Sequence, residues 1–166
     1  MKINQESTTL REELTHIGDY LSNQKLRFGE TLIFDIDIQS EVMDVNIPKF
    51  TLQPILENSF SHGLKNVGGV WKIRVYSIVG EDMKIIIEDN GSGVSPEEIE
   101  IINKQFQSRD NYLQIKDEEY FSGIGLVNID ARLKLLYGET YGLKLSSEDN
   151  KGVKVIITVP KKGASK

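Results

Sequence analysis

The residues with most capacity for chemistry are an aspartate and two glycines that follow an apolar strand. Residues 84–88 read as a strand, Asp89 comes next, and Gly91 and Gly93 follow at alternate positions. Glycine has no Cβ, so the backbone there can approach a ligand closely. A carboxylate held at a strand end can accept a hydrogen bond from a flat, amine-bearing ring. By itself, such a stretch after a strand is more often an ordinary turn.

A second candidate group is Asn58 with His62, on a predicted helix. Residues four apart share one helix face. Asn58 stands among apolar neighbours, where an amide needs a polar partner. Its carbonyl oxygen is a hard ligand that suits Mg²⁺, and His62 could hydrogen-bond phosphate oxygens. The alternative is that both side chains face solvent.

A third candidate group is Gly123 and Gly125 at the start of a predicted helix. Backbone N–H groups at a helix N-terminus favour phosphate. Residues 107–122, just before it, are polar and aperiodic, which predicts a mobile loop that could fold over a nucleotide. The sequence has no P-loop and no complete Gly-x-Gly-x-x-Gly after a strand, so a nucleotide site here must be of another design.

Hydrophobic periodicity predicts the elements that must position these groups. Ser95, Pro96 and Glu98 form a strong helix start with a capping box, and Pro54 should bend the helix that contains it. The predicted helices cover residues 8–27, 48–65, a short stretch after 95 and one ending at 138, and the predicted strands cover 32–38, 70–79, 83–88, 142–147 and 152–159. This order favours an α/β sandwich, with a mixed sheet covered by helices on one face.

Composition fits one globular domain. The chain has 166 residues, of which 39% are hydrophobic and 27% charged, with no cysteine and a formal net charge of -5. No basic stripe could follow a nucleic-acid backbone, so we expect no nucleic-acid partner. No apolar run reaches the length of a membrane span. We therefore expect no direct membrane contact in this chain, and an anchor for the whole protein would lie outside it.

Together, the three groups resemble the motifs of the GHKL ATPases, which include gyrase, MutL, heat-shock chaperone ATPases and sensor histidine kinases. Residues 52–63 resemble the N box, 89–94 the first glycine box and 123–126 the second. The Leu-Gln-Pro, Glu-Asn and His-Gly pairs of the N box, with residues 24–29 upstream, resemble sensor histidine kinases of the LytS/YesM type. The resemblance extends from about Leu10 to Pro160.

The resemblance implies an α+β fold of the Bergerat type, in which a mixed, mostly antiparallel sheet is covered on one face by helices. It implies ATP and Mg²⁺ as ligands. Asp89 would accept the adenine amino group, Gly91 and Gly93 would form the turn at the adenine pocket, and Asn58 would ligate Mg²⁺. His62 would contact phosphates.

The same resemblance makes residues 95–122 an ATP lid. Gly123, Gly125 and Leu126 of the second glycine box would let the lid backbone wrap the phosphates, and Asn128 would contact them.

Two further assignments stay open between a functional and an ordinary role. Thr158, in the last strand, could support Asp89 or a water beside adenine, or be an ordinary strand threonine. Glu57 could organise Mg²⁺ or water, or be a solvated glutamate on a helix face.

Kinases of this type carry their phosphate-accepting histidine upstream, in an Asn-Pro-His-Phe-Leu-Phe-Asn-like motif that this sequence lacks. His16 has different neighbours, so we expect it to be a surface residue. We expect a catalytic domain taken from a longer receptor. Residues 1–28 would form a connecting helix from a missing dimerisation and phosphoacceptor region, 29–162 the ATP-binding domain and 163–166 a tail.

The predicted function is that of a protein histidine kinase catalytic domain. It would pass the ATP γ-phosphoryl group to a histidine segment of the same protein or its dimer partner, for transfer to a response regulator. It would be the cytoplasmic domain of a membrane-bound receptor, unable to autophosphorylate alone. The alternatives are an anti-sigma-type serine kinase and a nucleotide-binding regulator without kinase activity.

Overall fold

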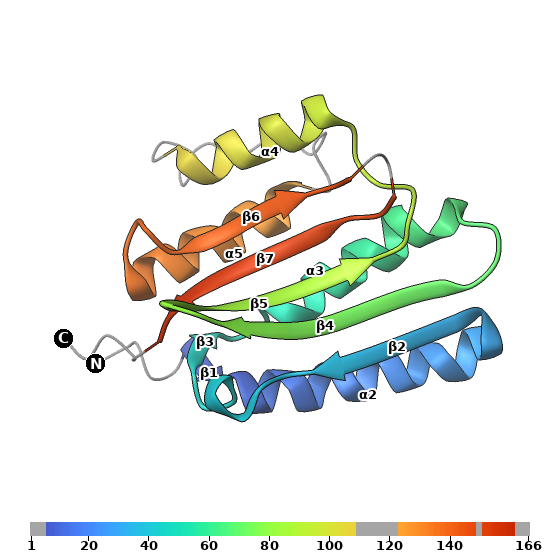
Figure 1. Ribbon diagram of the computed structural model, residues 1–166, viewed down its shortest axis with the longest axis horizontal. Helices are drawn as coiled ribbons and strands as arrows, with labels where there is room; N and C mark the ends of the chain where they lie inside the picture. Colours follow the sequence, from blue (N-terminus) through green and yellow to red (C-terminus); the bar gives the residue numbers. More distant parts are fainter. Residues whose placement is uncertain (1–5, 109–122, 149–150, 162–166) are drawn as a thin grey trace.

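The computed structural model describes residues 6–108, 123–148 and 151–161 (Figure 1). A five-stranded sheet carries helices on one face, and a two-stranded sheet lies beside it. The elements are β1 Ser7–Thr9, α2 Leu10–Phe28, β2 Leu32–Asp37, β3 Asn46–Pro48, α3 Leu52–Asn58, β4 Trp71–Val79, β5 Asp82–Asp89, α4 Pro96–Gln107, α5 Gly123–Tyr137, β6 Gly142–Ser146 and β7 Lys154–Pro160. No helix among these described residues is long and apolar enough to cross a membrane.

The large sheet has the strand order β2-β4-β5-β7-β6. The edge strand β2 runs parallel to β4, and every other neighbouring pair is antiparallel. The predicted hairpin is confirmed, because β4 and β5 pair directly across a short turn. The predicted class, a mixed and mostly antiparallel sheet with helices on one face, is therefore also confirmed.

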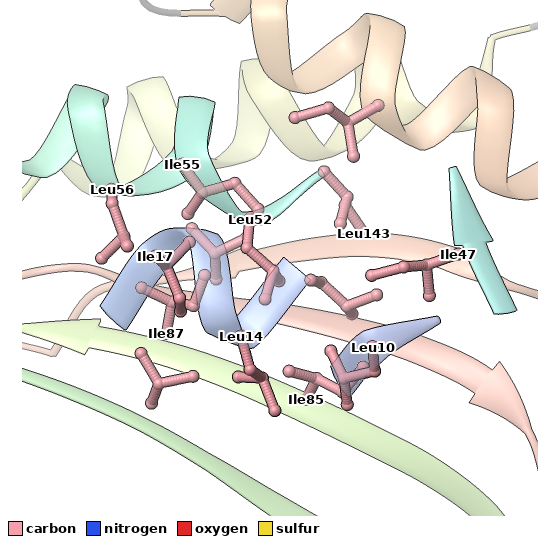
Figure 2. Packing of buried hydrophobic residues seen from close by; sticks show 14 of the residues in the cluster. Leu10, Leu14, Ile17, Ile47, Leu52, Ile55, Leu56, Ile85, Ile87 and Leu143 are labelled. Atoms are coloured by element: carbon pink, nitrogen blue, oxygen red, sulfur yellow. The ribbon is translucent and has the colours of Figure 1, made fainter. Parts of the chain in front are cut away.

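The core lies between the sheet and helices α2, α3 and α5. Leu10, Leu14, Ile17 and Leu21 recur at helical spacing on α2 and are all buried. They meet side chains of α3 and of the sheet, as Figure 2 shows for part of the cluster. Burying such a side chain stabilises the fold by about 1.5–3 kcal/mol relative to leaving it exposed. Helix α2 therefore belongs to the same hydrophobic core as the rest of the domain.

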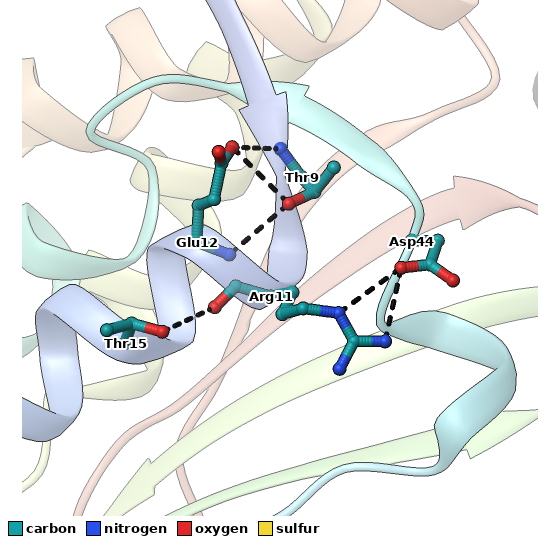
Figure 3. Close-up of polar contacts among 5 residues, drawn as sticks. All are labelled: Thr9, Arg11, Glu12, Thr15 and Asp44. Atoms are coloured by element: carbon teal, nitrogen blue, oxygen red, sulfur yellow. Dashed lines mark hydrogen bonds and ion pairs between the residues drawn. The ribbon is translucent and has the colours of Figure 1, made fainter.

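A capping box fixes the start of α2 (Figure 3). The Thr9 hydroxyl accepts the Glu12 N–H at 3.3 Å, and the Glu12 carboxylate accepts the Thr9 N–H at 3.2 Å. These bonds satisfy N–H groups that have no partner within the helix. Arg11 pairs with Asp44 at 3.2 Å, which ties the start of α2 to the segment before β3.

The helix predicted over residues 48–65 differs in both its start and its geometry. Pro48 lies in β3, opposite Ser7 of β1, and the helix begins at Leu52. Pro54 therefore occupies the first turn, where the N–H it lacks would have no helical partner, and the predicted bend is not needed. The chain leaves α-helical geometry only after Asn58, in a π-helical turn over Ser59–Gly63.

Helix α4 begins as predicted, with Ser95 as its N-cap and a capping box to Glu98. It is docked along the sheet edge by Asn103, whose amide donates to the Leu145 carbonyl at 2.9 Å and accepts the Leu145 N–H at 2.8 Å. The side chain thus gives β6 the bonds that a further strand would give. Residues 109–122, which include most of the predicted mobile loop, and the tail at 163–166 lie outside the described residues.

Candidate functional site

The site is built around Asp89, the last residue of β5, which is only 6% exposed. Its Oδ1 accepts the backbone N–H of Gly91 at 2.8 Å and that of Val153 at 3.2 Å. The Ser59 hydroxyl also hydrogen-bonds the carboxylate. An ionised carboxylate has about four acceptor positions. Asp89 is therefore held in one orientation and keeps the capacity to accept one more donor.

Burial governs the electrostatics of this carboxylate. Removal from water disfavours the charged form and raises the pKa of Asp89 above its ordinary value. The hydrogen bonds from Ser59, Gly91 and Val153 act in the opposite direction, and the net pKa shift is upward. An acceptor in such an apolar setting interacts strongly with a ligand donor, because little water competes for it.

Asp89 opens onto a cavity of about 340 Å³ between the helices and the sheet. Several apolar side chains of the helices and strands form its walls: Ile55, Ile101, Ile102, Leu126, Leu145, Val153 and Val155. The polar residues Asn58, Ser59, His62, Glu98 and Gln105 share the lining with Gly63, Gly93 and Val94. An apolar cavity with one fixed, buried acceptor suits a planar ring that carries an amino group.

Asn58 and His62 both line this cavity, as the sequence predicts for a shared helix face. Asn58 is the last residue of α3, and His62 lies in the π-helical turn that follows it. Asn58 is partly exposed and His62 is exposed. Both are thus accessible to a ligand that extends outward from the buried Asp89.

The donor set fits a magnesium ion that is held mainly by its substrate. The described residues contain no group of three or more His, Asp or Glu side chains that could hold a metal alone. Mg²⁺ usually keeps several waters and binds proteins through few side chains together with substrate phosphates. The Asn58 amide oxygen is one such hard ligand.

The glycine turn is seated against the end of the helix that carries Asn58. The Ser92 N–H donates to the Gly63 carbonyl at 2.9 Å. A Cβ on Gly91 would come within 2.6 Å of backbone carbon of Gly63, so only glycine permits this approach. Asn90 anchors the turn from the other side, because its side chain bonds the Lys72 N–H at 2.7 Å and the Val70 carbonyl at 2.9 Å.

The second glycine segment lies where the sequence predicts it, because α5 begins at Gly123. Leu126 of its first turns lines the cavity, whereas Gly125 and Asn128 are exposed and outside the lining. Part of the predicted second glycine box thus lies beside the cavity.

Glu57 and Thr158, two further predicted site residues, also lie outside the cavity lining. Glu57 is exposed and accepts a hydrogen bond from Gln53 at 3.1 Å. Thr158 lies opposite Lys84, near the far end of the β5–β7 pair from Asp89. Side chains alternate along a strand, so Thr158 also points to the other face of the sheet from Val155 and Ile157. It therefore cannot support Asp89 directly.

Sequence reasoning missed the residues just after β6 and just before β7 that hold Asp89 and its glycine turn in place. The Val153 backbone N–H supports Asp89, which is the role predicted for Thr158. Gly152 has φ +94°, and a Cβ there would lie 1.9 Å from the Asp89 carbonyl oxygen. Ser147 links the same elements, since it donates to the Gly152 carbonyl at 2.6 Å and accepts the Val94 N–H at 3.3 Å. The only signal in the sequence was the glycine just before the last strand.

The fold and the site define an α/β-sandwich domain with a small-molecule cavity over the end of its central strand. A family model described as "Histidine kinase-, DNA gyrase B-, and HSP90-like ATPase" matches residues 44–163. The chain belongs to this ATPase family.

Two individual relatives match most of the chain. The chain is 35% identical over 153 residues to the sensor histidine kinase YesM of Bacillus subtilis (strain 168), covering 92% of this chain and 24% of YesM. It is 30% identical over 154 residues to the sensor protein LytS of the same strain, covering 91% of this chain and 24% of LytS. The chain thus spans about a quarter of the length of these relatives.

Among solved structures, the catalytic domain of the histidine kinase ThkA superposes with a TM-score of 0.60 at 16% sequence identity, covering 93% of this chain and 94% of that one. At this identity the likeness shows the fold.

Proposed function

We propose that this chain binds Mg-ATP and supplies the γ-phosphoryl group to a histidine on another segment of a sensor histidine kinase. The phosphoryl group would then pass to a response regulator. The whole protein would be a membrane-bound receptor with this domain in the cytoplasm, preceded by a dimerising region that continues into α2. The names of the relatives, a sensor histidine kinase and a sensor protein, support the assignment to a sensor kinase.

One observation carries the proposal: a buried, oriented carboxylate at one end of an apolar cavity whose lining also includes Asn58 and His62. Asp89 would accept the adenine amino group at the acceptor position that the protein leaves to it. The apolar side chains would cover the faces of the ring. Asn58 and His62 would then meet the phosphates at the exposed side.

For phosphoryl transfer to a histidine, the domain would need to position its substrate and would not need to supply a strong proton acceptor. A nitrogen of the acceptor imidazole would form a bond to the γ-phosphorus while the bond from that phosphorus to the bridging oxygen of ADP breaks. The imidazole proton would leave to solvent. Catalysis of such transfers comes mainly from orientation and charge stabilisation. His62 could donate a hydrogen bond to a phosphate oxygen, and Asp89 would fix the adenine ring at the other end of the nucleotide.

Magnesium, when bound, would neutralise charge on the phosphate oxygens. Asn58 would hold it through its amide oxygen, and the other positions would be filled by phosphate oxygens and water.

His16 is separated from this site. It is exposed on α2, and none of the cavity-lining residues belongs to that helix. This placement supports an acceptor histidine outside the chain.

Calorimetric titration of the domain with ATP, with and without Mg²⁺, tests the proposal. We expect Mg²⁺ to strengthen ATP binding, and Asn58→Ala to reduce this Mg²⁺ effect by about tenfold, the equivalent of 1.4 kcal/mol. Ser61→Ala is the matched control, since Ser61 is exposed in the π-helical turn that directly follows this helix and lies outside the cavity lining. Absence of ATP binding at millimolar concentration, or an unchanged Mg²⁺ effect in Asn58→Ala, would contradict the proposal.

A phosphotransfer assay distinguishes a histidine kinase from a serine kinase and from a nucleotide-binding regulator. The domain with ³²P-labelled ATP should label a supplied dimerisation segment with its acceptor histidine, in an acid-labile form. Labelling of serine on an anti-anti-sigma partner would instead indicate the serine kinase. Binding without any transfer would indicate a nucleotide-binding regulator.

A further inference from the structure

A buried glutamate on α2 holds the start of the helix that carries Asn58. Glu13 is 3% exposed. Its carboxylate accepts the backbone N–H groups of Phe50 at 2.7 Å, Thr51 at 3.0 Å and Leu52 at 3.1 Å. The first N–H groups of a helix have no partner within the helix. Glu13 therefore caps α3 from a residue about forty positions earlier in the chain, whereas Thr51, the N-cap residue, makes no side-chain cap of its own.

An arginine on α5 holds the same turn from the other side. The Arg132 guanidinium donates to the carbonyl of Lys49 at 2.8 Å and approaches that of Phe50 at 3.4 Å. Glu13 thus binds the N–H groups of this turn, and Arg132 binds its carbonyl groups. We call the two side chains with residues 49–52 the α3 clamp.

The turn inside the α3 clamp has a backbone that requires support. Phe50 has φ +58°, the one positive φ at a non-glycine position among the described residues. Side chains with a Cβ rarely adopt this conformation, and it persists only where the surroundings enforce it. Phe50 is 65% exposed, so packing of its ring does not enforce it. The hydrogen bonds that this turn makes with Glu13 and Arg132 hold the Phe50 backbone in this conformation.

Helix α2 also contacts the other end of the same helical segment. Phe60, in the π-helical turn between Asn58 and His62, packs against Tyr20 and Phe28 of α2, with ring centroids 5.8 and 6.2 Å apart. Helix α2 thus braces the segment from its first N–H groups to the turn that lines the cavity, while buried Ile17 of α2 and Leu52 of α3 lie in the core between them (Figure 2).

We propose that Glu13 and Arg132 are positioning residues, which set the place of Asn58 and His62 relative to Asp89 by clamping the first turn of α3. The proposal rests on the proposed ATP site and adds to it two residues that do not themselves line the cavity. Asp89 accepts N–H groups of Gly91 and Val153, which lie outside α3 and its π-helical turn, and only the Ser59 hydroxyl reaches it from that turn. Loosening the clamp should therefore displace Asn58 and His62, on the phosphate side of the site, more than it displaces Asp89 on the adenine side.

The different response expected on the phosphate side and the adenine side can be tested, because a variant that had only lost stability would not show it. Glu13→Gln keeps the size of the side chain but places an amide N–H₂ against backbone N–H donors. We expect its affinity for Mg-ATP to fall about tenfold, as for the loss of one charge-assisted hydrogen bond. Its affinity for adenosine, which needs only the Asp89 side, should change less than about twofold, an energy of a few tenths of a kcal/mol. Both ligands are titrated by calorimetry or by NMR chemical shifts.

Asp19→Asn is the matched control, because it makes the same chemical change at an exposed position of the same helix. It should leave both affinities unchanged. Arg132→Lys provides a second perturbation of the clamp, since an ammonium group cannot donate to two carbonyls in the fixed geometry of a guanidinium. We expect the same selective loss of Mg-ATP affinity, in a variant that keeps its charge.

The outcomes are distinguishable. Selective loss of Mg-ATP affinity in either clamp variant supports the positioning role. An equal loss for Mg-ATP and adenosine, or no loss, overturns it, and if Glu13→Gln does not fold, Arg132→Lys decides by the same comparison. Failure of the wild-type chain to bind either ligand overturns the ATP site itself.

Discussion

Replacing Asp89 by asparagine changes the donor and acceptor pattern of the site while preserving its shape. The asparagine carbonyl can take the place of Oδ1 and keep the N–H groups of Gly91 and Val153 as donors. The amide N–H₂ then stands where the second carboxylate oxygen stood. The Ser59 hydroxyl can rotate to accept from it, because a hydroxyl both donates and accepts. The protein's own hydrogen bonds therefore survive the change.

The ligand's hydrogen bond does not survive it. An adenine amino group would meet a donor in place of an acceptor, and a hydrogen bond to a charged group contributes about 1.5–3 kcal/mol. At 1.4 kcal/mol per factor of ten, ATP affinity should fall by about tenfold to a hundredfold. The free energy of unfolding should stay within about 1 kcal/mol of the wild type, because a neutral amide avoids the cost of burying an ionised carboxylate.

The assay is calorimetric titration with Mg-ATP, paired with urea unfolding of the same protein samples. Glu88→Gln is the control, because the neighbouring carboxylate lies 3.8 Å from Lys154, is 42% exposed and does not line the cavity. It should bind ATP as the wild type does. Unchanged ATP affinity in Asp89→Asn, with the control also unchanged, would refute the assignment of Asp89 to adenine. A large fall in stability would refute the claim that the protein's own bonds survive.

Three further predictions concern pH, a glycine contact and a helix cap. Burial raises the pKa of Asp89, so between the unfolded and the folded pKa the folded state holds a proton that the unfolded chain has released. The stabilisation from this proton is complete below the unfolded pKa and is lost as pH rises through the folded pKa. Thermal melts against pH should show this slope in the wild type and not in Asp89→Asn, and ATP affinity should fall as pH drops through the same pKa. Gly91→Ala would place a Cβ 2.6 Å from Gly63 backbone and should cost about 1–3 kcal/mol in urea unfolding, whereas Gly125→Ala meets no atom within 4 Å and should not destabilise the fold. Ser95→Ala removes the α4 cap and should cost about 0.5–2 kcal/mol in the same assay.

Each of these has an outcome that contradicts it. Parallel pH profiles of wild type and Asp89→Asn would show that another group sets the slope. Equal stabilities of Gly91→Ala and Gly125→Ala would mean that the glycine turn can move away from the helix at no cost. An unaltered stability in Ser95→Ala would show that water replaces the hydroxyl without loss.

Local pattern determined much of the fold. The apolar spacing of Leu10, Leu14, Ile17 and Leu21 predicts the buried face of α2, because residues three and four apart share one side of a helix. Ser95 predicts the start of α4 in the same way, since a capping box involves only neighbours in sequence. Asp89 was identifiable because its strand and its glycine turn are adjacent along the chain.

Register and long-range packing decided the rest. Thr158 looked suitable by residue type, but its pairing with Lys84 puts it far from Asp89, and no local pattern contains that pairing. Pro48 looked like a helix start, but pairing with Ser7 makes it part of a strand.

Local propensity determined most of the helices and strands that the chain forms and indicated Asp89, Asn58 and His62 as side chains that could bind a nucleotide. The tertiary structure alone decided that Val153 holds Asp89 and that Glu13 and Arg132 hold the helix of Asn58. Those bonds join residues 38 to 83 positions apart in sequence. Such a contact forms only after the sheet and helices have packed, so residue type and spacing along the chain could not reveal it.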